Sequence, residues 1–291
     1  MKKKMLSLLA CPLCKGGLVS SEKQLRCTHC SKHYPVRQGV PVLLDTDNLP
    51  EHLQGQIRYF NRAARIYGTP QATAPWQRKY IEHLFQNLKS KKNKILVDDA
   101  CGSGYVSLGA ARKGMYVFAC DVNLSGLVQL RKYAETLGLS DKIFPVCCRA
   151  EALPFRADSA DAIVANAILE HLPNEQDAIS DISRIAKKGA IAIITVPLAY
   201  YLLNPLFLLI NYVHDRQIGH LRRYTKEKLK KRFHDWKTLS VTYTGHTAKV
   251  IKTLLNLIRP LFDEEEIEKE DARKSAEKVF ASNISIIFLK K

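Results

Sequence analysis

The chain has 291 residues, of which 46% are hydrophobic and 25% are charged. This length and apolar content allow one large domain, or one large and one small, and exclude a chain that is disordered throughout. The 45 Lys and Arg against 28 Asp and Glu give a formal net charge of +17, which favours an anionic partner such as RNA, a phosphorylated metabolite or a membrane surface.

The N-terminus imitates the signal sequence of a secreted lipoprotein. Three lysines precede a short apolar run that ends at Cys11. That run is shorter than the roughly 7–15 apolar residues of a signal sequence. Four later cysteines, Cys101, Cys120, Cys147 and Cys148, lie in apolar or turn contexts that favour reduced thiols. We therefore expect a cytoplasmic protein.

Two cysteine pairs open the chain. Cys11 and Cys14 form one C-x-x-C turn, and Cys27 and Cys30 form another after a gap of twelve residues. Two such turns bring four sulfurs around one zinc ion in tetrahedral geometry. The alternatives are two disulfides or four unrelated thiols. His29 and His33 are substitute ligands or, with four cysteines present, groups outside the coordination sphere.

Residues 8–44 resemble the small zinc-ribbon proteins that activate methyltransferases, and the ribbon heads fused to some of them. The resemblance implies a ribbon over residues 1–45 that staples the fold or docks to a partner. A closed four-cysteine site carries out no zinc chemistry by itself. Residues 46–93 are expected to form a helical connector, with a helix over Ile81–Leu88 and breaks at Pro50, Gly68, Pro70 and Pro75.

From residue 94 onward, apolar strands alternate with helices. The expected strands cover residues 95–98, 116–120, 142–147, 162–166, 190–196, 238–244 and 284–289, and the expected helices begin at Ser103 and Leu124 and cover residues 176–186. Nearly continuous apolar strands that alternate with helices are typical of a parallel sheet covered on both faces. The pattern therefore predicts a doubly wound α/β fold with a mainly parallel seven-stranded sheet.

The first two of these strands carry a nucleoside-binding pattern. The first leads into a turn of small residues, Ala100 to Gly104, and the second ends at Asp121. Small residues let the backbone approach a ligand closely, and a carboxylate at the next strand end accepts hydrogen bonds from two ribose hydroxyls.

Residues 94–290 resemble the class I S-adenosylmethionine-dependent methyltransferases of the small-molecule branch. The blocks that carry the resemblance are residues 97–104, Asp121, residues 150–155, residues 161–172 and residues 185–190. The resemblance implies that Asp98 orients the methionine ammonium end and that Asp121 holds the ribose. It further implies that the cofactor site includes Ala100, Gly102 and Gly104 at the turn, Ala150, Glu151 and Leu153 around the adenine, and Asn166 and Ala167 near the sulfonium.

Two residues depart from the pattern of that family. Ala100 stands where the family usually has its first glycine, and Arg149 stands where an Asp usually contacts the adenine amino group. The first change is mild, whereas the second is expected to weaken cofactor binding.

The segment after residue 196 is expected to be an acceptor-binding insertion over residues 197–236. Its apolar start touches the lower length limit of a membrane span. Asn204 and Pro205 predict instead a short lid helix over Leu206–His214, and no transmembrane span is expected. A peripheral membrane contact through residues 197–236 stays open, because the basic cluster over residues 222–231 suits phospholipid headgroups or an anionic glycan carrier.

Methyl transfer to a hydroxyl needs a group that removes the acceptor proton. His171, which follows the fourth strand, is one candidate base. His220 and Tyr224 lie in the insertion and are candidates for the base or for acceptor contacts. Thr225 is instead expected to cap a helix over Lys226–Phe233.

Three functions fit these patterns. The first is methyl transfer to an oxygen or nitrogen of a small molecule, a glycan or a lipid-linked acceptor. The second is methylation of a ribosomal or transfer RNA base, because a ribbon followed by a methyltransferase looks like the large-subunit rRNA guanine methyltransferases. Against it, Asn166 does not open an Asn-Pro-Pro-aromatic block, and no Pro-Cys nucleophile is present. The third is a noncatalytic docking protein with a degraded cofactor pocket.

Overall fold

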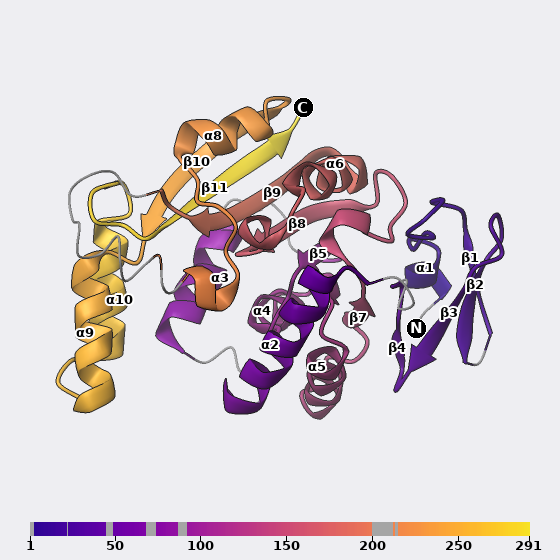
Figure 1. Cartoon of the computed structure of the whole chain (residues 1–291), viewed down its shortest axis with the longest axis horizontal. Helices are drawn as coiled ribbons and strands as arrows, with labels where there is room; N and C mark the ends of the chain where they lie inside the picture. The colour runs from indigo at the N-terminus through magenta and orange to yellow at the C-terminus, as the bar shows by residue number, and fades with distance from the viewer. Residues whose placement is uncertain are drawn as a thin grey trace.

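A computed structural model of the protein describes residues 3–21, 23–44, 49–67, 74–86, 92–199, 212 and 215–291. Seven strands form one sheet in the order β10-β11-β9-β8-β5-β6-β7 (Figure 1). Neighbouring strands from β9 to β7 are parallel, and β10 and β11 add an antiparallel pair next to β9. The seven strands are β5 Ile95–Asp99, β6 Tyr116–Asp121, β7 Ile143–Cys147, β8 Ala160–Asn166, β9 Ala186–Pro197, β10 Trp236–Thr244 and β11 Asn283–Lys290. The predicted fold class is confirmed.

Helices cover both faces of this sheet because its parallel strands are apolar on both sides. Ile95 and Val97 of β5 join a core with α6 and α8, whereas Leu96 between them joins a second core with α3, α4 and α5. The helices are α1 Lys3–Leu6, α2 Glu51–Tyr67, α3 Pro75–Gln86, α4 Tyr105–Arg112, α5 Leu124–Thr136, α6 Glu175–Ile185, α8 Lys226–Arg232, α9 Thr247–Ile258 and α10 Glu264–Arg273, with the 3₁₀ turns η2 Ala150–Ala152 and η3 Leu169–His171.

The N-terminal segment forms a separate four-stranded antiparallel sheet. Its strands are β1 Leu18–Ser20, β2 Gln24–Cys27, β3 His33–Arg37 and β4 Val40–Pro41. This small sheet lies against the β7 edge of the large one (Figure 1). Val42 bridges Cys147 in parallel register, and the N–H of Leu43 donates to the carbonyl of Cys147 at 2.7 Å. The N-terminal segment therefore covers a sheet edge that would otherwise expose unpaired backbone groups.

The two sheets also share one apolar core. Leu9, Tyr34 and Leu43 of the N-terminal segment belong to the same buried cluster as Phe118 and Phe155. Leu9 bridges Phe155, and the N–H of Ala10 donates to the carbonyl of Pro154 at 2.9 Å. The N-terminal segment is therefore packed as a part of the main body.

The structure corrects the expected connector. Residues 51–67 form the helix α2, for which the expected helical connector gives no bounds, and α3 begins at Pro75 rather than at Ile81. Pro75 starts this helix instead of breaking the chain, because the first turn of a helix leaves backbone N–H groups unpaired and proline lacks one. Leu88, the expected end of the helix, lies outside the described residues.

Other boundaries are close to those expected. β9 begins at Ala186 rather than at Ala190, directly after α6. Thr225 caps α8, since its hydroxyl accepts a hydrogen bond from the N–H of Lys228. The expected lid helix over Leu206–His214 falls almost entirely outside the described residues. Within the described parts of the chain, no helix is long and apolar enough to cross a membrane.

Candidate functional site

The four predicted zinc ligands come together in the N-terminal segment. The Sγ atoms of these cysteines all lie within 4.8 Å of one another; the residues are Cys11, Cys14, Cys27 and Cys30. The Sγ atoms of Cys11 and Cys30 are 3.7 Å apart, and those of Cys14 and Cys27 are 3.4 Å apart. Zinc–sulfur bonds of about 2.3 Å in tetrahedral geometry place the sulfurs about 3.8 Å apart. The donor set and its dimensions therefore fit one zinc ion.

Backbone N–H donors favour the thiolate form of Cys27. Burial opposes ionisation of Cys27, but its Sγ accepts hydrogen bonds from the N–H groups of Cys30 and His29, which lower the pKa of Cys27 to about 6. The four cysteines are free thiols in the structure, and the thiolate is the form that binds zinc.

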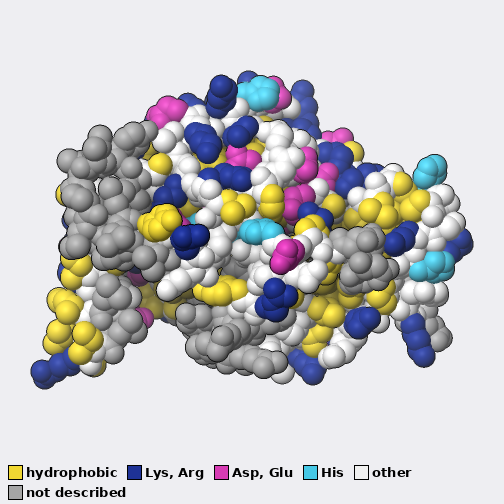
Figure 2. Space-filling model, viewed as in Figure 1, with side chains coloured by type: hydrophobic (Ala, Val, Ile, Leu, Met, Phe, Trp, Pro, Cys, Tyr) yellow, Lys and Arg dark blue, Asp and Glu magenta, His cyan; other side chains and the backbone are white. Residues whose placement is uncertain are grey.

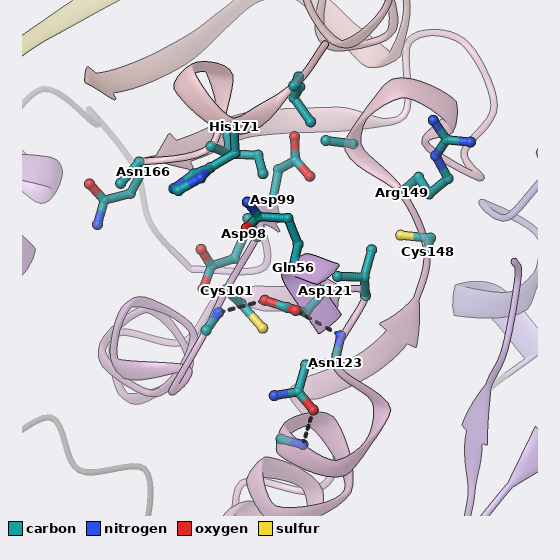
Figure 3. Close-up of a pocket in the computed structure, with 18 of the residues that line it drawn as sticks. Gln56, Asp98, Asp99, Cys101, Asp121, Asn123, Cys148, Arg149, Asn166 and His171 are labelled. Atoms are coloured by element: carbon teal, nitrogen blue, oxygen red, sulfur yellow. Dashed lines mark hydrogen bonds between the residues drawn. The ribbon is translucent and has the colours of Figure 1, made fainter. Parts of the chain in front are cut away.

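A second candidate site is a cavity of about 390 Å³ at the carboxyl ends of β5, β6 and β8 (Figure 3). This is the edge at which open parallel sheets bind their ligands. Its floor includes the turn after β5, one wall includes Cys148, Arg149 and Ala150, and the opposite wall includes Asn166 and His171. The cavity is concave, largely apolar and large enough for a nucleoside with a short side chain.

Asp121 stands at the floor of the cavity. Its Oδ2 accepts a hydrogen bond from the N–H of Gly102 at 2.9 Å, and its Oδ1 accepts one from the N–H of Asn123 at 2.8 Å (Figure 3). Burial raises the pKa of Asp121, and these backbone donors oppose that shift. Each carboxylate oxygen has a second lone pair, so Asp121 is held in place and still able to accept hydrogen bonds from a diol.

The turn between β5 and α4 depends on residues in the left-handed conformation. Ala100, Gly102 and Gly104 have φ values of 59°, 50° and 76°. A Cβ on Gly102 would meet no atom within 4 Å, whereas one on Gly104 would lie 2.5 Å from Cδ1 of Leu130 in α5. Gly102 therefore leaves open space at the cavity, and Gly104 permits close packing of the start of α4 against α5.

Two buried carboxyl groups follow each other at the end of β5. Asp98 and Asp99 both line the cavity. Burial raises the pKa of Asp98 to about 7, while a hydrogen bond of 2.6 Å donated by Ser107 opposes this shift. Burial and then the charge of Glu151 raise the pKa of Asp99, and its Oδ2 has no hydrogen-bond partner among the described residues. A cation, or a ligand with hydrogen-bond donors, would satisfy these groups.

The helix α2 closes the cavity from above. His52, Leu53 and Gln56 of α2 line it, and Nε2 of His52 is 2.7 Å from the carbonyl oxygen of His171. Figure 3 shows the side chain of Gln56 in the cavity together with Asp98 and Asp99. No motif in the sequence signals these contacts, because a helical connector has no residue spacing that marks it as part of a cavity.

Comparison with known families places this cavity in context. Residues 97–194 match the family model of a methyltransferase domain, and residues 2–39 match that of Trm112p-like proteins. The first match covers β5 to β9 and therefore the sheet edge that forms the cavity. Residues 97–194 therefore resemble a methyltransferase domain, and the solved structure described next shares the fold of the large sheet. The N-terminal segment is a Trm112p-like ribbon.

Individual relatives match separate parts of the chain. An uncharacterized chloroplastic methyltransferase of Arabidopsis thaliana, At2g41040, is 33% identical over 38% of this chain. The match spans 33% of that relative's own length. A UPF0434 protein of Coxiella burnetii is 42% identical over 17% of the chain and 93% of its own length. The solved structure of geranyl diphosphate C-methyltransferase from Streptomyces coelicolor A3(2) superposes with a TM-score of 0.62, at 14% identity, over 83% of this chain and 99% of its own.

Most of the expected cofactor residues line the cavity. They are Asp98, Ala100, Gly102, Asp121, Ala150, Glu151, Asn166 and Ala167. Gly104 and Leu153 do not line it. Leu153 is fully buried in the core shared with the ribbon, and its carbonyl accepts hydrogen bonds from Lys15 and Arg184. Cys148, Asn123 and Gln129 line the cavity and were not expected to do so.

Arg149 pairs with a neighbour on its own loop. Its guanidinium donates to Oε1 of Glu151 at 2.9 Å, and Figure 3 shows the side chain directed away from the other labelled residues. The unusual arginine at this position is therefore compensated locally, and Glu151 carries the acidic group that this loop presents.

The three expected acceptor-side residues have different surroundings. His171 lines the cavity, and burial lowers its pKa to about 4. His220 and Tyr224 are not among the lining residues. Nδ1 of His220 lies 2.8 Å from Oδ1 of Asp215, and the buried hydroxyl of Tyr224 donates to Glu175. These contacts favour a structural role for Tyr224.

Proposed function

We propose that this protein transfers a methyl group from S-adenosylmethionine to an oxygen or nitrogen of a small-molecule, glycan or lipid-linked acceptor. The observation that carries the proposal is the cavity at the carboxyl ends of β5, β6 and β8, with Asp121 held at its floor by two backbone N–H groups. S-Adenosylmethionine, when bound, supplies an activated methyl group on a positively charged sulfur.

The residues around the cavity would each hold one part of the cofactor. Asp121 would accept hydrogen bonds from the ribose hydroxyls, and Asp98 would pair with the ammonium group of the methionine end. The η2 turn would flank the adenine through Ala150. Asn166 and Ala167 would lie near the methyl group, and the side chain of Asn166 is fixed by a hydrogen bond of 2.7 Å to the hydroxyl of Tyr105.

Methyl transfer is an in-line displacement, so the protein contributes mainly alignment and exclusion of water. The helix α2 supports this function because His52, Leu53 and Gln56 cover the cavity. His171 and His220 are the candidates for removing a proton from the acceptor, and their ring centroids lie 4.8 Å apart. The proposal also includes a zinc ion with a structural role, bound by the four cysteines of the ribbon.

Charge favours RNA as a second acceptor class. Lys and Arg side chains gather over the region of α8 (Figure 2), a helix that has Lys230, Lys231 and Arg232 in its last turn. Basic clusters of this kind bind phosphate backbones in a salt-dependent manner. The order of ribbon and methyltransferase also fits an enzyme that acts on RNA.

A calorimetric titration of zinc-replete protein with S-adenosylhomocysteine tests the cofactor site. We expect micromolar binding in the wild type and a loss of at least about 100-fold in Asp121→Ala, because two charge-assisted hydrogen bonds are removed. Leu229→Ala, in a buried position of α8 away from the cavity, serves as the control. Absence of binding in the wild type would favour a noncatalytic docking protein.

The acceptor class is tested with radiolabelled S-adenosylmethionine and fractionated cell extract. Label in the lipid, glycan or small-molecule fraction, abolished by Asp121→Ala, is the expected result. Label in the RNA fraction would replace the proposed acceptor class with the second one, and salt-insensitive or absent RNA binding would remove RNA from consideration.

A further inference from the structure

A second group of metal-binding side chains lies beside the cofactor cavity. Glu170 and His171 belong to η3, and His220 comes from the segment before α8. One donor atom from each of these three residues lies within 4.8 Å of the other two. Nε2 of His220 is 3.7 Å from Oε1 of Glu170. Residues 50 positions apart in sequence therefore bring two imidazoles and a carboxylate to one point.

The carboxylate of Glu170 needs a partner at this point. The residue is 0% exposed, and neither of its carboxylate oxygens has a hydrogen-bond partner among the described residues. The N–H of Leu221 donates to the backbone carbonyl of Glu170, so this hydrogen bond does not involve the side-chain carboxylate. Burying a carboxylate without a partner costs several kcal/mol, which a bound cation would offset.

Neighbouring groups orient His220 as they orient metal ligands. Nδ1 of His220 is 2.8 Å from Oδ1 of Asp215, and Arg223 donates to both oxygens of Asp215 at 2.7 and 2.8 Å. An imidazole that donates its Nδ1–H to a carboxylate carries its lone pair on Nε2, the atom that faces Glu170. Histidine ligands of metal ions are commonly held by a carboxylate in this way.

The second histidine is held by backbone. Nδ1 of His171 is 3.3 Å from the carbonyl oxygen of Gly219, the residue directly before His220. The histidines therefore share one structural support, because the turn that presents His220 also contacts His171. Of the three side chains, that of His171 lines the cofactor cavity, next to Ala167 and Ile168.

We propose that Glu170, His171 and His220 bind one divalent first-row transition ion, such as Zn²⁺ or Mn²⁺. Two imidazoles and one carboxylate are a donor set suited to these ions, and three protein ligands leave coordination positions open. Metal–ligand bonds of about 2.0–2.2 Å place neighbouring donors about 3 Å apart, so the bound ion draws the three side chains inward. The ribbon site differs, because its four cysteines complete a tetrahedral shell.

The position of this ion at the cavity wall narrows the acceptor class, an extension that rests on the proposed methyl transfer. An ion with an open position binds an acceptor oxygen and lowers the pKa of that hydroxyl. Because His171 and His220 are then metal ligands and no longer candidate bases, the hydroxyl proton passes to water. An oxygen lone pair then forms the new bond to the methyl carbon as the carbon–sulfur bond breaks, and the bonding pair stays on sulfur. The expected acceptors therefore carry a hydroxyl that is able to bind a metal.

Titration of the full chain with Mn²⁺ tests the site. The ribbon is first loaded with Zn²⁺, and free Mn²⁺ is then measured by electron paramagnetic resonance. We expect one Mn²⁺ per wild-type chain, displaced by added Zn²⁺, and affinity reduced by more than about 100-fold in Glu170→Gln and His220→Gln. His234→Gln is the matched control, because the His234 side chain is 73% exposed outside the cluster.

Thermal unfolding and cofactor titration separate the outcomes. Mn²⁺ should raise the Tm of the wild type and of His234→Gln but not of Glu170→Gln, since an ion that binds only the folded state stabilises it. The proposal is overturned if the wild type binds no Mn²⁺ or Zn²⁺ beyond the ribbon ion, or if Glu170→Gln keeps full affinity. Mn²⁺ binding in a protein that binds no S-adenosylhomocysteine would leave the metal site standing and remove the proposed function.

Discussion

The four-cysteine ribbon and the cofactor cavity differ in how far apart in the sequence their residues lie. The ribbon takes its four sulfurs from residues 11–30, within two short turns. The cavity takes its lining from residues 50–173, which belong to several strand ends, α2 and two 3₁₀ turns. The four-cysteine cluster is therefore built from a short stretch of sequence, whereas the cavity exists only once the large sheet has assembled.

The two regions are nevertheless coupled. Backbone hydrogen bonds join Ala10 to Pro154 and Leu43 to Cys147, and Lys15 donates to the carbonyl of Leu153 at 3.2 Å. Cys147 and Pro154 flank the loop that forms one wall of the cavity. The ribbon therefore supports this wall from behind, so damage to the ribbon should reach the cofactor site.

Loss of the ribbon metal should have the largest effect. Cys14→Ser removes one sulfur of the tetrahedral cluster, and we expect the free energy of unfolding to fall by more than about 4 kcal/mol, because metal binding and folding of a ribbon are one event. Differential scanning fluorimetry should show a Tm lower by more than about 10 °C. His33→Gln, an exposed change in the same ribbon, should leave the Tm unchanged. Equal Tm values for the two variants would show that the cluster holds no structural ion.

The contact between the two regions is tested by Leu43→Ala. Leu43 is 1% exposed, and truncating a buried leucine costs about 2–5 kcal/mol. We also expect the affinity for S-adenosylhomocysteine to fall by about 0.5–2 kcal/mol, since Leu43 is hydrogen-bonded to the end of β7 beside the cavity wall. Leu229→Ala removes an equally buried side chain from α8 and should lower stability alone. If both variants bind the ligand equally well, the ribbon and the cavity are uncoupled.

Two glycines of the β5–α4 turn should separate stability from binding. Gly104→Ala places a Cβ 2.5 Å from Leu130 at a φ of 76°, and we expect a loss of stability of about 2–4 kcal/mol. Gly102→Ala meets no atom within 4 Å, so its stability loss should be about 1 kcal/mol while ligand affinity falls. Urea unfolding and calorimetry measure the two quantities. Reversed effects would mean that Gly102 is not at the ligand surface.

The smallest expected effect is the pH dependence of cofactor binding. Burial raises the pKa of Asp98 to about 7, and the positive ammonium group of the cofactor binds only the ionised carboxylate. Affinity should therefore be full above about pH 7 and fall by up to tenfold for each pH unit below it. Asp98→Asn should remove this dependence. Ser107→Ala should move its midpoint upward, because the hydroxyl of Ser107 stabilises the ionised form. A midpoint unchanged in Ser107→Ala would assign the titration to another group.

The sequence is informative where spacing or periodicity encodes the structure directly. Spacing alone predicts that four cysteines cluster, namely Cys11, Cys14, Cys27 and Cys30. The seven strands are located within a few residues, because parallel strands form continuous apolar runs in the sequence. Asp121 is identified because it directly follows an apolar strand, at the sheet edge where nucleoside ligands bind in this fold.

The cover of the cavity could not be predicted in the same way. α2 presents His52, Leu53 and Gln56 to the cavity, and these residues have no spacing that distinguishes them from a surface helix. Gly104 and Leu153 show the opposite case, since they do not line the cavity. They belong to the motif blocks, yet Gly104 permits the packing of α4 against α5, and Leu153 packs in the shared core.

The sequence by itself thus determined the fold class, the four-cysteine cluster and the acidic end of β6, because each depends on residues close together in the chain. Only the tertiary structure decided that the ribbon completes the edge beside β7 and that Glu170 and His171 meet His220. Those contacts join segments far apart in sequence, and their energies come from burial and pairing in three dimensions, which no local pattern records.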